Sequence, residues 1–279
     1  MQQAQMTEVR EALARGMLVP YLSAGMLTLV ADCPVPDSQE GLAAFITTQV
    51  TVPHKIRNRL TAAAQFIENF KHRKTLVKLM NQAFAATAAP SSLHRALAGL
   101  PRLPLVVDLW YDDAMQRALA QRADWCQLQG MSQAEHFGTW YRGYDARGNA
   151  IDEAVAGQCG TLLYKPLGGR APSANYLISD SDYVELLTEI DIQTPIPALV
   201  QTLRKERGFL FLGCRFNDQL QRTMARQIMK RSAGPHWAVL TGELTRNERR
   251  FMDEQQIRQI DIPLAQFEID VALPALVPS

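Results

Sequence analysis

Residues 17–25 read MLVPYLSAG, a short apolar run that stops at three small residues. A continuous apolar run of this length is typical of a strand that is buried on both faces, as in a parallel sheet. Small residues directly after such a strand predict a turn in which the backbone comes close to another group. We therefore predict a buried strand up to Leu22 and a close approach at Ser23, Ala24 and Gly25.

Strand patterns and helix patterns alternate along the rest of the chain. Further strand-like runs lie at residues 104–110, 161–165, 175–178, 209–212, 237–240 and 260–262. Helix start signals stand between them, including Asp180 with Ser181 and Thr194 with Pro195. This alternation predicts an α/β protein with a doubly wound, Rossmann-like parallel sheet that helices cover on both faces.

Two stretches depart from the alternation. Residues 38–100 carry helix patterns, among them one long helix over 54–86, and predict a helical insertion. Residues 124–160 hold six glycines and few aliphatic residues, so we predict a small Gly-rich excursion there. The chain shows no internal repeat, and we predict one domain over residues 1–279 that carries both insertions.

Composition and charge exclude several classes of protein. The chain has 279 residues, of which 47% are hydrophobic and 20% charged, so long disorder is excluded. A net charge of +1 provides no overall attraction to nucleic acid or to a membrane. No apolar run approaches the length of about 18 residues that a membrane helix needs, and the first residues lack the apolar core of a signal peptide. We expect a cytoplasmic protein.

The cysteines and histidines form no metal-binding pattern. Cys33, Cys126, Cys159 and Cys214 are far apart and include no C-x-x-C pair, which argues against a disulfide framework and against a zinc ribbon. The five histidines form no spaced pair with each other or with a cysteine. We therefore expect no metal site.

Five segments, in order, resemble those of sirtuin-like domains. Residues 18–26 (LVPYLSAGM) resemble the opening strand and its G-A-G turn. Residues 94–101 with 105–119 resemble the helix, the strand and the T-T-N-Y-D-D segment. Residues 163–169 (LYKPLGG) resemble the K-x-H-G-D segment, and residues 176–183 (YLISDSDY) resemble the V-L-T-x-x-D-Y segment that follows it. Residues 209–218 (FLFLGCRFND) resemble the L-F-L-G-Y-S-x-x-D segment. The similarity is to the bacterial sirtuin-like group found in NAD-consuming phage-defence proteins rather than to the zinc-bearing deacetylases.

This resemblance implies a nucleotide ligand, NAD or ADP-ribose, at the carboxyl ends of the strands. It implies that the backbone turn at Ala24, Gly25 and Met26 faces the ligand phosphates. The residues that it places against the cofactor are Ser23, Ala24, Gly25, Met26, Asp108, Gly213, Cys214, Arg215 and Asn217.

The catalytic positions of the family are not retained. Its Asn, which orders a water and the ribose hydroxyls, corresponds to Trp110, and its His, the general base, corresponds to Leu167. Asp108 and Asp112 are the candidates that could substitute for them. Each carboxylate also has a structural interpretation, Asp108 as an acceptor of hydrogen bonds at a strand end and Asp112 as a helix cap. Lys165 could bind a phosphate, although an exposed lysine at a strand end is the commoner case.

Two basic stretches remain. Arg222, Arg226 and Lys230 recur every four residues, and further lysines and arginines load residues 55–59 and 71–78. A solvated helix face explains such a pattern. No aromatic residues interleave with these charges, which argues against a nucleic-acid partner.

Three functions are consistent with these observations. The first is a catalytically degenerate protein that binds NAD, ADP-ribose or a related nucleotide in a sensing or scaffold role. The second is a working NAD-consuming hydrolase or NAD-dependent deacylase that uses rearranged groups. The third is a protein-interaction subunit in which Trp110 and Leu167 close the pocket. A protein partner or a second copy of the chain is compatible with each.

Overall fold

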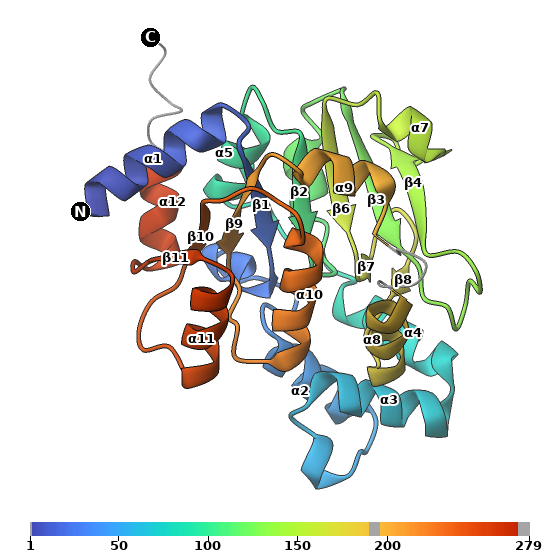
Figure 1. The fold of residues 1–279 in the computed structure, drawn as a ribbon. Helices are drawn as coiled ribbons and strands as arrows, with labels where there is room; N and C mark the ends of the chain where they lie inside the picture. The colour runs from blue at the N-terminus through green and yellow to red at the C-terminus, as the bar shows by residue number, and fades with distance from the viewer. Residues whose placement is uncertain (1, 190–195, 273–279) are drawn as a thin grey trace.

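The computed structural model describes residues 2–189 and 196–272, and within them one nine-stranded sheet forms the centre (Figure 1). Its order is β11-β10-β9-β1-β2-β6-β3-β4-β5. All neighbours from β11 to β3 are parallel, and β4 and β5 extend the sheet in antiparallel fashion. The strands are β1 (Leu18–Leu22), β2 (Leu105–Asp108), β3 (Trp125–Gly130), β4 (Tyr141–Asp145), β5 (Ala150–Ile151), β6 (Thr161–Lys165), β9 (Gly208–Leu212), β10 (His236–Val239) and β11 (Ile257–Ile260). The predicted α/β, doubly wound fold is confirmed.

Helices cover both faces of the sheet, and each face has its own apolar core. One core joins the sheet to α1 (Gln2–Ala14), α5 (Ser92–Ala98), α6 (Ala114–Leu119) and α12 (Leu264–Ala272). The other joins it to α9 (Ala198–Arg204), α10 (Gln219–Met229), α11 (Arg246–Glu254) and α8 (Asp180–Glu189). Strand β1 shows why its sequence is apolar throughout, because Leu18 and Leu22 enter the first core while Val19 and Tyr21 enter the second.

The stretch 38–100 contains only helices, and most of them extend past the carboxyl ends of the central strands (Figure 1). They are α2 (Gln39–Gln49), the 3-10 turn η2 (His54–Ile56), α3 (Leu60–Lys71), α4 (Arg73–Ala83) and α5. We refer to this stretch as the helical insertion. The single long helix expected over 54–86 is wrong, since the chain breaks at His72, whose φ of +68° is left-handed.

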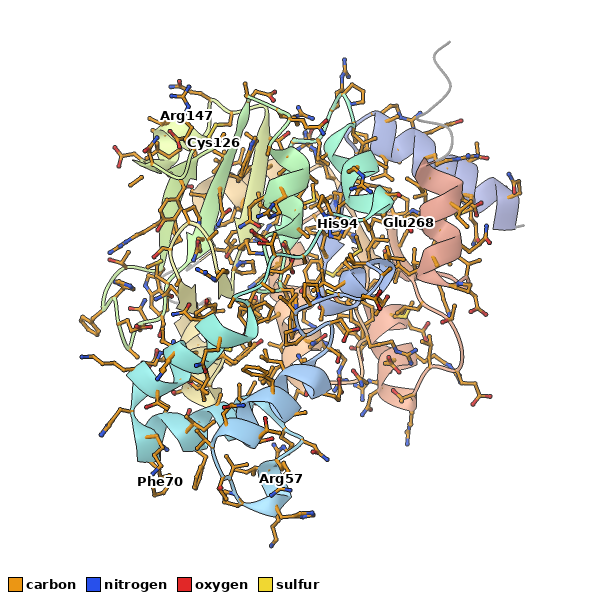
Figure 2. The ribbon with its side chains drawn as sticks, turned by 180° about the vertical axis from the view of Figure 1, so that it is seen from behind. Arg57, Phe70, His94, Cys126, Arg147 and Glu268 are labelled. Atoms are coloured by element: carbon orange, nitrogen blue, oxygen red, sulfur yellow. A yellow bond between two sulfur atoms is a disulfide. The ribbon has the colours of Figure 1, made fainter. Side chains whose placement is uncertain are left out.

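The stretch 124–160 is built into the sheet rather than outside it. Strand β3 lies between β6 and β4 and is buried along its whole length. Its polar residues are also buried, and the Gln129 amide donates to the Ser173 carbonyl at 2.6 Å. Cys126 on β3 forms a disulfide with Cys159, a single bond that the sequence argument against a disulfide framework did not foresee. Figure 2 places Cys126 at the end of the molecule opposite the insertion.

Residues 175–178 contribute only the short β8 (Asn175–Tyr176), which pairs with β7 (Gly168–Gly169) outside the main sheet. The predicted helix start at Thr194 and Pro195 lies outside the described residues. In the ranges that are described, no helix combines the length and apolar character needed to cross a membrane.

Candidate functional site

A cleft of about 580 Å³ lies at the carboxyl edge of the sheet, between the helical insertion and the loop that follows β9. We call it the outer cleft. The helical insertion contributes Gln39, Glu40, Asn58, Arg59, Leu60 and Thr61, and the sheet side contributes Asp180, Tyr183, Asn217, Asp218, Gln219 and Leu220. Figure 1 shows α2, α3 and α8 beyond the arrowheads of the central strands, which is where ligands of doubly wound folds bind.

Four helices begin at this cleft, namely α2, α3, α8 and α10. Helix N-termini carry partial positive charge and unpaired N–H groups, so their convergence favours acceptor groups of a ligand. Helix α3 begins without a side-chain cap, whereas Asp218 caps α10 by accepting from the N–H groups of Leu220 and Gln221 at 2.8 and 3.2 Å. The Asp218 carboxylate, which also lines the cleft, therefore serves as the N-cap of α10.

Most of the charged side chains of the outer cleft are negative and offset the partial positive charge of these helix N-termini. Glu40, Asp180 and Asp218 are carboxylates, and Arg59 is the one cation among the residues that line the cleft. The Arg59 side chain is exposed and has no ion pair within the described ranges. The cleft thus combines oxygen acceptors for hydroxyl groups with a single cationic group for an anion.

A second, much smaller cavity continues the outer cleft inward. We call it the inner cavity. Its volume of about 10 Å³ is enough for about one water molecule. Gln39, Leu60 and Tyr183 line both spaces, so the two are adjacent. The inner cavity is further lined by Ser23, Leu109, Trp110, Tyr111, Leu167, Gln221 and Met224.

Trp110 and Leu167 fill the space at the inner cavity. Trp110 is 3% exposed and Leu167 is 4% exposed. The indole N–H of Trp110 donates to the Pro36 carbonyl at 2.7 Å, which uses its only donor. Its ring lies 5.9 Å from that of Phe84 and 5.2 Å from that of Tyr111, measured between centroids. The two residues that the resemblance aligns with the family's catalytic Asn and His therefore form an apolar plug.

Asp108 and Lys165 form a buried ion pair behind this plug. The Lys165 ammonium donates to Asp108 Oδ2 at 2.6 Å and to the carbonyls of Trp110 and Asp112 at 2.6 and 3.1 Å. Asp108 Oδ1 accepts from the Trp110 N–H at 3.0 Å. The Lys165 side chain is fully buried, which corrects the expectation of an exposed lysine at a strand end. Asp108 lines neither cavity. In this geometry it does not face a space in which a ligand could bind or react.

Asp112 occupies the start of α6. Its Oδ1 accepts from the Ala114 N–H at 2.8 Å, so the carboxylate bonds the first residue of the helix, while the N-cap residue itself is Asp113. Burial raises the pKa of this carboxyl to about 6, and the negative charge of Asp108 adds to the rise while the Lys165 cation opposes it. Asp112 also lines neither of the two cavities.

The turn after β1 makes its close approach to the end of β9. The Gly25 N–H donates to the Gly213 carbonyl at 2.9 Å, and the Met26 N–H donates to the Ser23 carbonyl at 3.0 Å. A Cβ on Gly25 would lie 2.6 Å from the Gly213 oxygen. Ala24 and Met26 are buried in the two cores, and of this turn only Ser23 lines the inner cavity. Two of the N–H groups that a phosphate would need are thus already bonded within the protein.

The other predicted contacts follow β9. Gly213 has a left-handed φ of +66°, and the thiol of Cys214 is buried, which raises its pKa to about 12. Arg215 turns away from the cleft, because its guanidinium pairs with Glu248 at 2.8 Å and with two carbonyls beyond β10. Asn217 lines the outer cleft. Arg215 is thus held in these bonds and does not line the outer cleft, whereas Asn217 stands where a ligand could reach it.

Sequence reasoning missed the cleft residues of the helical insertion and of α8. The cleft residues of the insertion, Gln39, Arg59 and Thr61, lie at the starts of α2 and α3. In the sequence these positions indicate only that a helix begins there. Their proximity to Asn217 depends on how the insertion folds over the sheet, which no local pattern encodes. The start signal at Asp180 and the Ser38 cap of α2, which accepts from the Gly41 N–H, mark helix N-termini here without marking a ligand site.

Comparisons with known proteins identify one family. The model of the SIR2-like domain matches residues 104–260, which is more than half of the chain. The matched range contains β2, β6, β9 and the residues that follow each of them. No curated protein matches the chain. Among residues 2–189 and 196–272, no group of three or more metal-ligating side chains is gathered.

Proposed function

The chain belongs to the SIR2-like domain family, and from that premise we propose that it binds NAD, ADP-ribose or a related nucleotide in the outer cleft without efficient turnover. Such a protein acts as a sensor of the nucleotide or as a scaffold that the nucleotide controls.

The contrast between the two adjoining spaces carries this proposal. The outer cleft has a volume within the range of about 300–1,000 Å³ that small-molecule sites occupy. The inner cavity has room for about one water molecule, where a ribosyl-nicotinamide group would need far more. A nucleotide can therefore place its adenosine and phosphate portion in the outer cleft while its nicotinamide end finds no pocket.

The cleft residues have assignable roles toward such a ligand. Arg59 and the uncapped first turn of α3 supply donors for phosphate oxygens. The amides of Asn58 and Asn217 can donate to and accept from a base, and Asp180 can accept from ribose hydroxyls. The cation and the carboxylates then act on different parts of one ligand.

Turnover is excluded from the proposal on chemical grounds. Cleavage of the nicotinamide bond requires a group that orders the ribose and a group that handles its proton. Trp110 has no free donor, Leu167 has no polar atom, and both oxygens of Asp108 are bonded. We expect NAD hydrolysis and deacylation at background rates, since the loss of such groups costs orders of magnitude in rate.

Titration calorimetry with NAD and ADP-ribose, together with chromatography of nicotinamide, tests the proposal. We expect saturable binding, with ADP-ribose at least as tight as NAD, and no nicotinamide release. Arg59→Ala removes a charge-assisted hydrogen bond and should weaken binding about tenfold or more. Arg57→Ala is the matched control, because Arg57 is exposed at the outer end of the insertion and lines no part of the cleft (Figure 2).

Two outcomes contradict the proposal. Steady nicotinamide release by the pure protein, lost in Asp108→Ala or Asp112→Ala, would make the chain a working NAD-consuming enzyme. Neither binding nor release would leave the third function, an interaction subunit with a closed pocket.

A further inference from the structure

A groove lined by arginines runs between α10 and α11, which lie side by side in Figure 1. Its deeper part has a volume of about 260 Å³ and is lined from both helices. Through Arg250 and Glu254 it continues along α11 into a shallower part of about 370 Å³. We call the surface formed by Arg222, Arg226, Arg246, Arg249 and Arg250 the arginine groove.

The arginine groove keeps an excess of positive charge. Asp253 and Glu254 are the acidic residues that line it, against five arginines. Glu254 is shared by Arg226 at 3.5 Å and Arg250 at 2.7 Å. Arg246 and Arg249 are exposed and have neither an ion pair nor a side-chain hydrogen bond within the part of the chain that the structure describes. The groove is therefore strongly basic on a chain whose net charge is only +1.

Arg250 pairs with Glu254 one turn on in the same helix, but helix stability does not explain Arg246 or Arg249. Arg246 is the first residue of α11, and Arg249 and Arg250 follow in its first turns. Cations near a helix N-terminus are unfavourable because that end already carries partial positive charge. The end is stabilised instead by a capping box between Thr245 and Glu248. The positive charge at this helix start is thus unfavourable for the helix itself. This indicates that the arginines serve an interaction with another molecule.

The donors of the groove match phosphate oxygens. Every cation that lines it is an arginine, whose planar guanidinium binds phosphate through two parallel hydrogen bonds. The side-chain amides of Asn247 and Gln219 add uncharged donors of the kind that contact phosphodiester backbones. The one aromatic residue, Phe251, is buried beneath Arg226, whose guanidinium carbon lies 5.7 Å from the ring centroid.

The residues that line the groove include neither exposed apolar side chains, which a protein partner would bury, nor exposed aromatic rings, on which bases would stack.

We propose that the arginine groove binds the phosphate backbone of duplex nucleic acid without reading its bases. In the sequence, no aromatic residues interleave with the charges of residues 55–59, of residues 71–78 or of the stripe on α10, which argued against nucleic acid, and the arginines of α11 lie outside all three stretches. Folding brings three arginines of α11 onto the same surface, and that addition is what changes the conclusion.

Fluorescence anisotropy with a labelled mixed-sequence duplex, at about 50 and about 200 mM salt, tests this proposal on the full chain. Each phosphate neutralised contributes about 0.9 to the slope of log affinity against log salt. Arg246→Ser/Arg249→Ser should weaken binding at least about tenfold and lower that slope by about 2. Each single variant should show an intermediate loss. Both side chains are exposed and unpaired, so the fold, checked by circular dichroism, should be unchanged.

Lys55→Ser/Arg57→Ser is the matched control, because it removes the same charge from an exposed segment of the insertion, away from the groove. It should bind duplex like the wild type. Absence of salt-dependent binding by the wild type, or an equal loss in both double variants, would overturn the proposal. Preference for a poly-glutamate peptide over the duplex would overturn it too and would assign the groove to an acidic protein segment. None of these results depends on ADP-ribose binding in the outer cleft.

Discussion

At the scale of single residues, the ammonium group of Lys165 fixes the end of strand β2 by binding Asp108 and two backbone carbonyls. Lys165→Met leaves the buried Asp108 carboxylate without its counter-charge. We expect this variant to lose about 3–5 kcal/mol of unfolding free energy, measured by urea denaturation. Lys165→Met/Asp108→Asn removes both charges and should recover part of the loss. An equal loss in the single and double variants would mean that the pair itself contributes nothing beyond packing.

His94 makes the protein sensitive to acid. Burial lowers the pKa of its imidazole to about 4, and Nδ1 lies 2.9 Å from the Ser91 hydroxyl in the capping box of α5. Between the unfolded pKa of about 6.5 and pH 4, the unfolded chain takes up a proton that the folded chain refuses, so stability falls as the pH falls. Burial lowers the pKa of His236 to about 4, with the same sign, whereas Asp112, raised to about 6, acts in the opposite direction.

His94→Gln keeps the capping box, since glutamine suits its third position, and removes the titration. We expect a decline in stability between pH 6.5 and 4 that is smaller than in the wild type by an amount on the order of 3 kcal/mol. Denaturation curves at stepped pH measure it, with the exposed His54→Gln as control. Parallel pH profiles for the wild type and His94→Gln would show that His94 does not titrate as described.

At the scale of elements, β1 and β9 end in a contact that only glycine permits. A Cβ at Gly25 would lie 2.6 Å from the Gly213 oxygen and 3.0 Å from its carbonyl carbon. Gly25→Ala should therefore destabilise the fold by about 1–3 kcal/mol in denaturant unfolding. In Gly157→Ala the nearest atom is 3.4 Å away, so this control should stay close to the wild type. A bulky residue at position 25 consequently reports on the strand junction rather than on nucleotide binding.

The same scale shows which elements a sequence can predict. Strands β1, β6 and β9 are buried on both faces and have apolar runs, so pattern and structure agree. Strand β3 was missed because the amide N–H groups of the buried Gln127 and Gln129 donate to partners inside the protein, and no local pattern marks such partners. The break between α3 and α4 depends on the left-handed backbone of His72, a conformation that the residue type does not signal.

At the scale of the whole molecule, the candidate site is shared between distant parts of the chain. The sequence could predict that a site stands after β1, β2 and β9, because parallel strands present their carboxyl ends to one edge. Of the residues that it names, Ser23 lines the inner cavity and Asn217 lines the outer cleft, and their contact with a nucleotide stays a prediction. It could not place Arg59 or Asp180, because the insertion and α8 reach the cleft only through tertiary packing.

The plug formed by Trp110 and Leu167 also constrains how this molecule can change over evolutionary time. Replacing either residue by a small polar one would leave a cavity in a packed core, at a cost of several kcal/mol for a residue as large as tryptophan. The Lys165 brace would still hold the backbone of Trp110 and Asp112 in its present position. Under the proposed function, a single substitution in the plug would therefore lower the stability of the fold before it made room for a nicotinamide group.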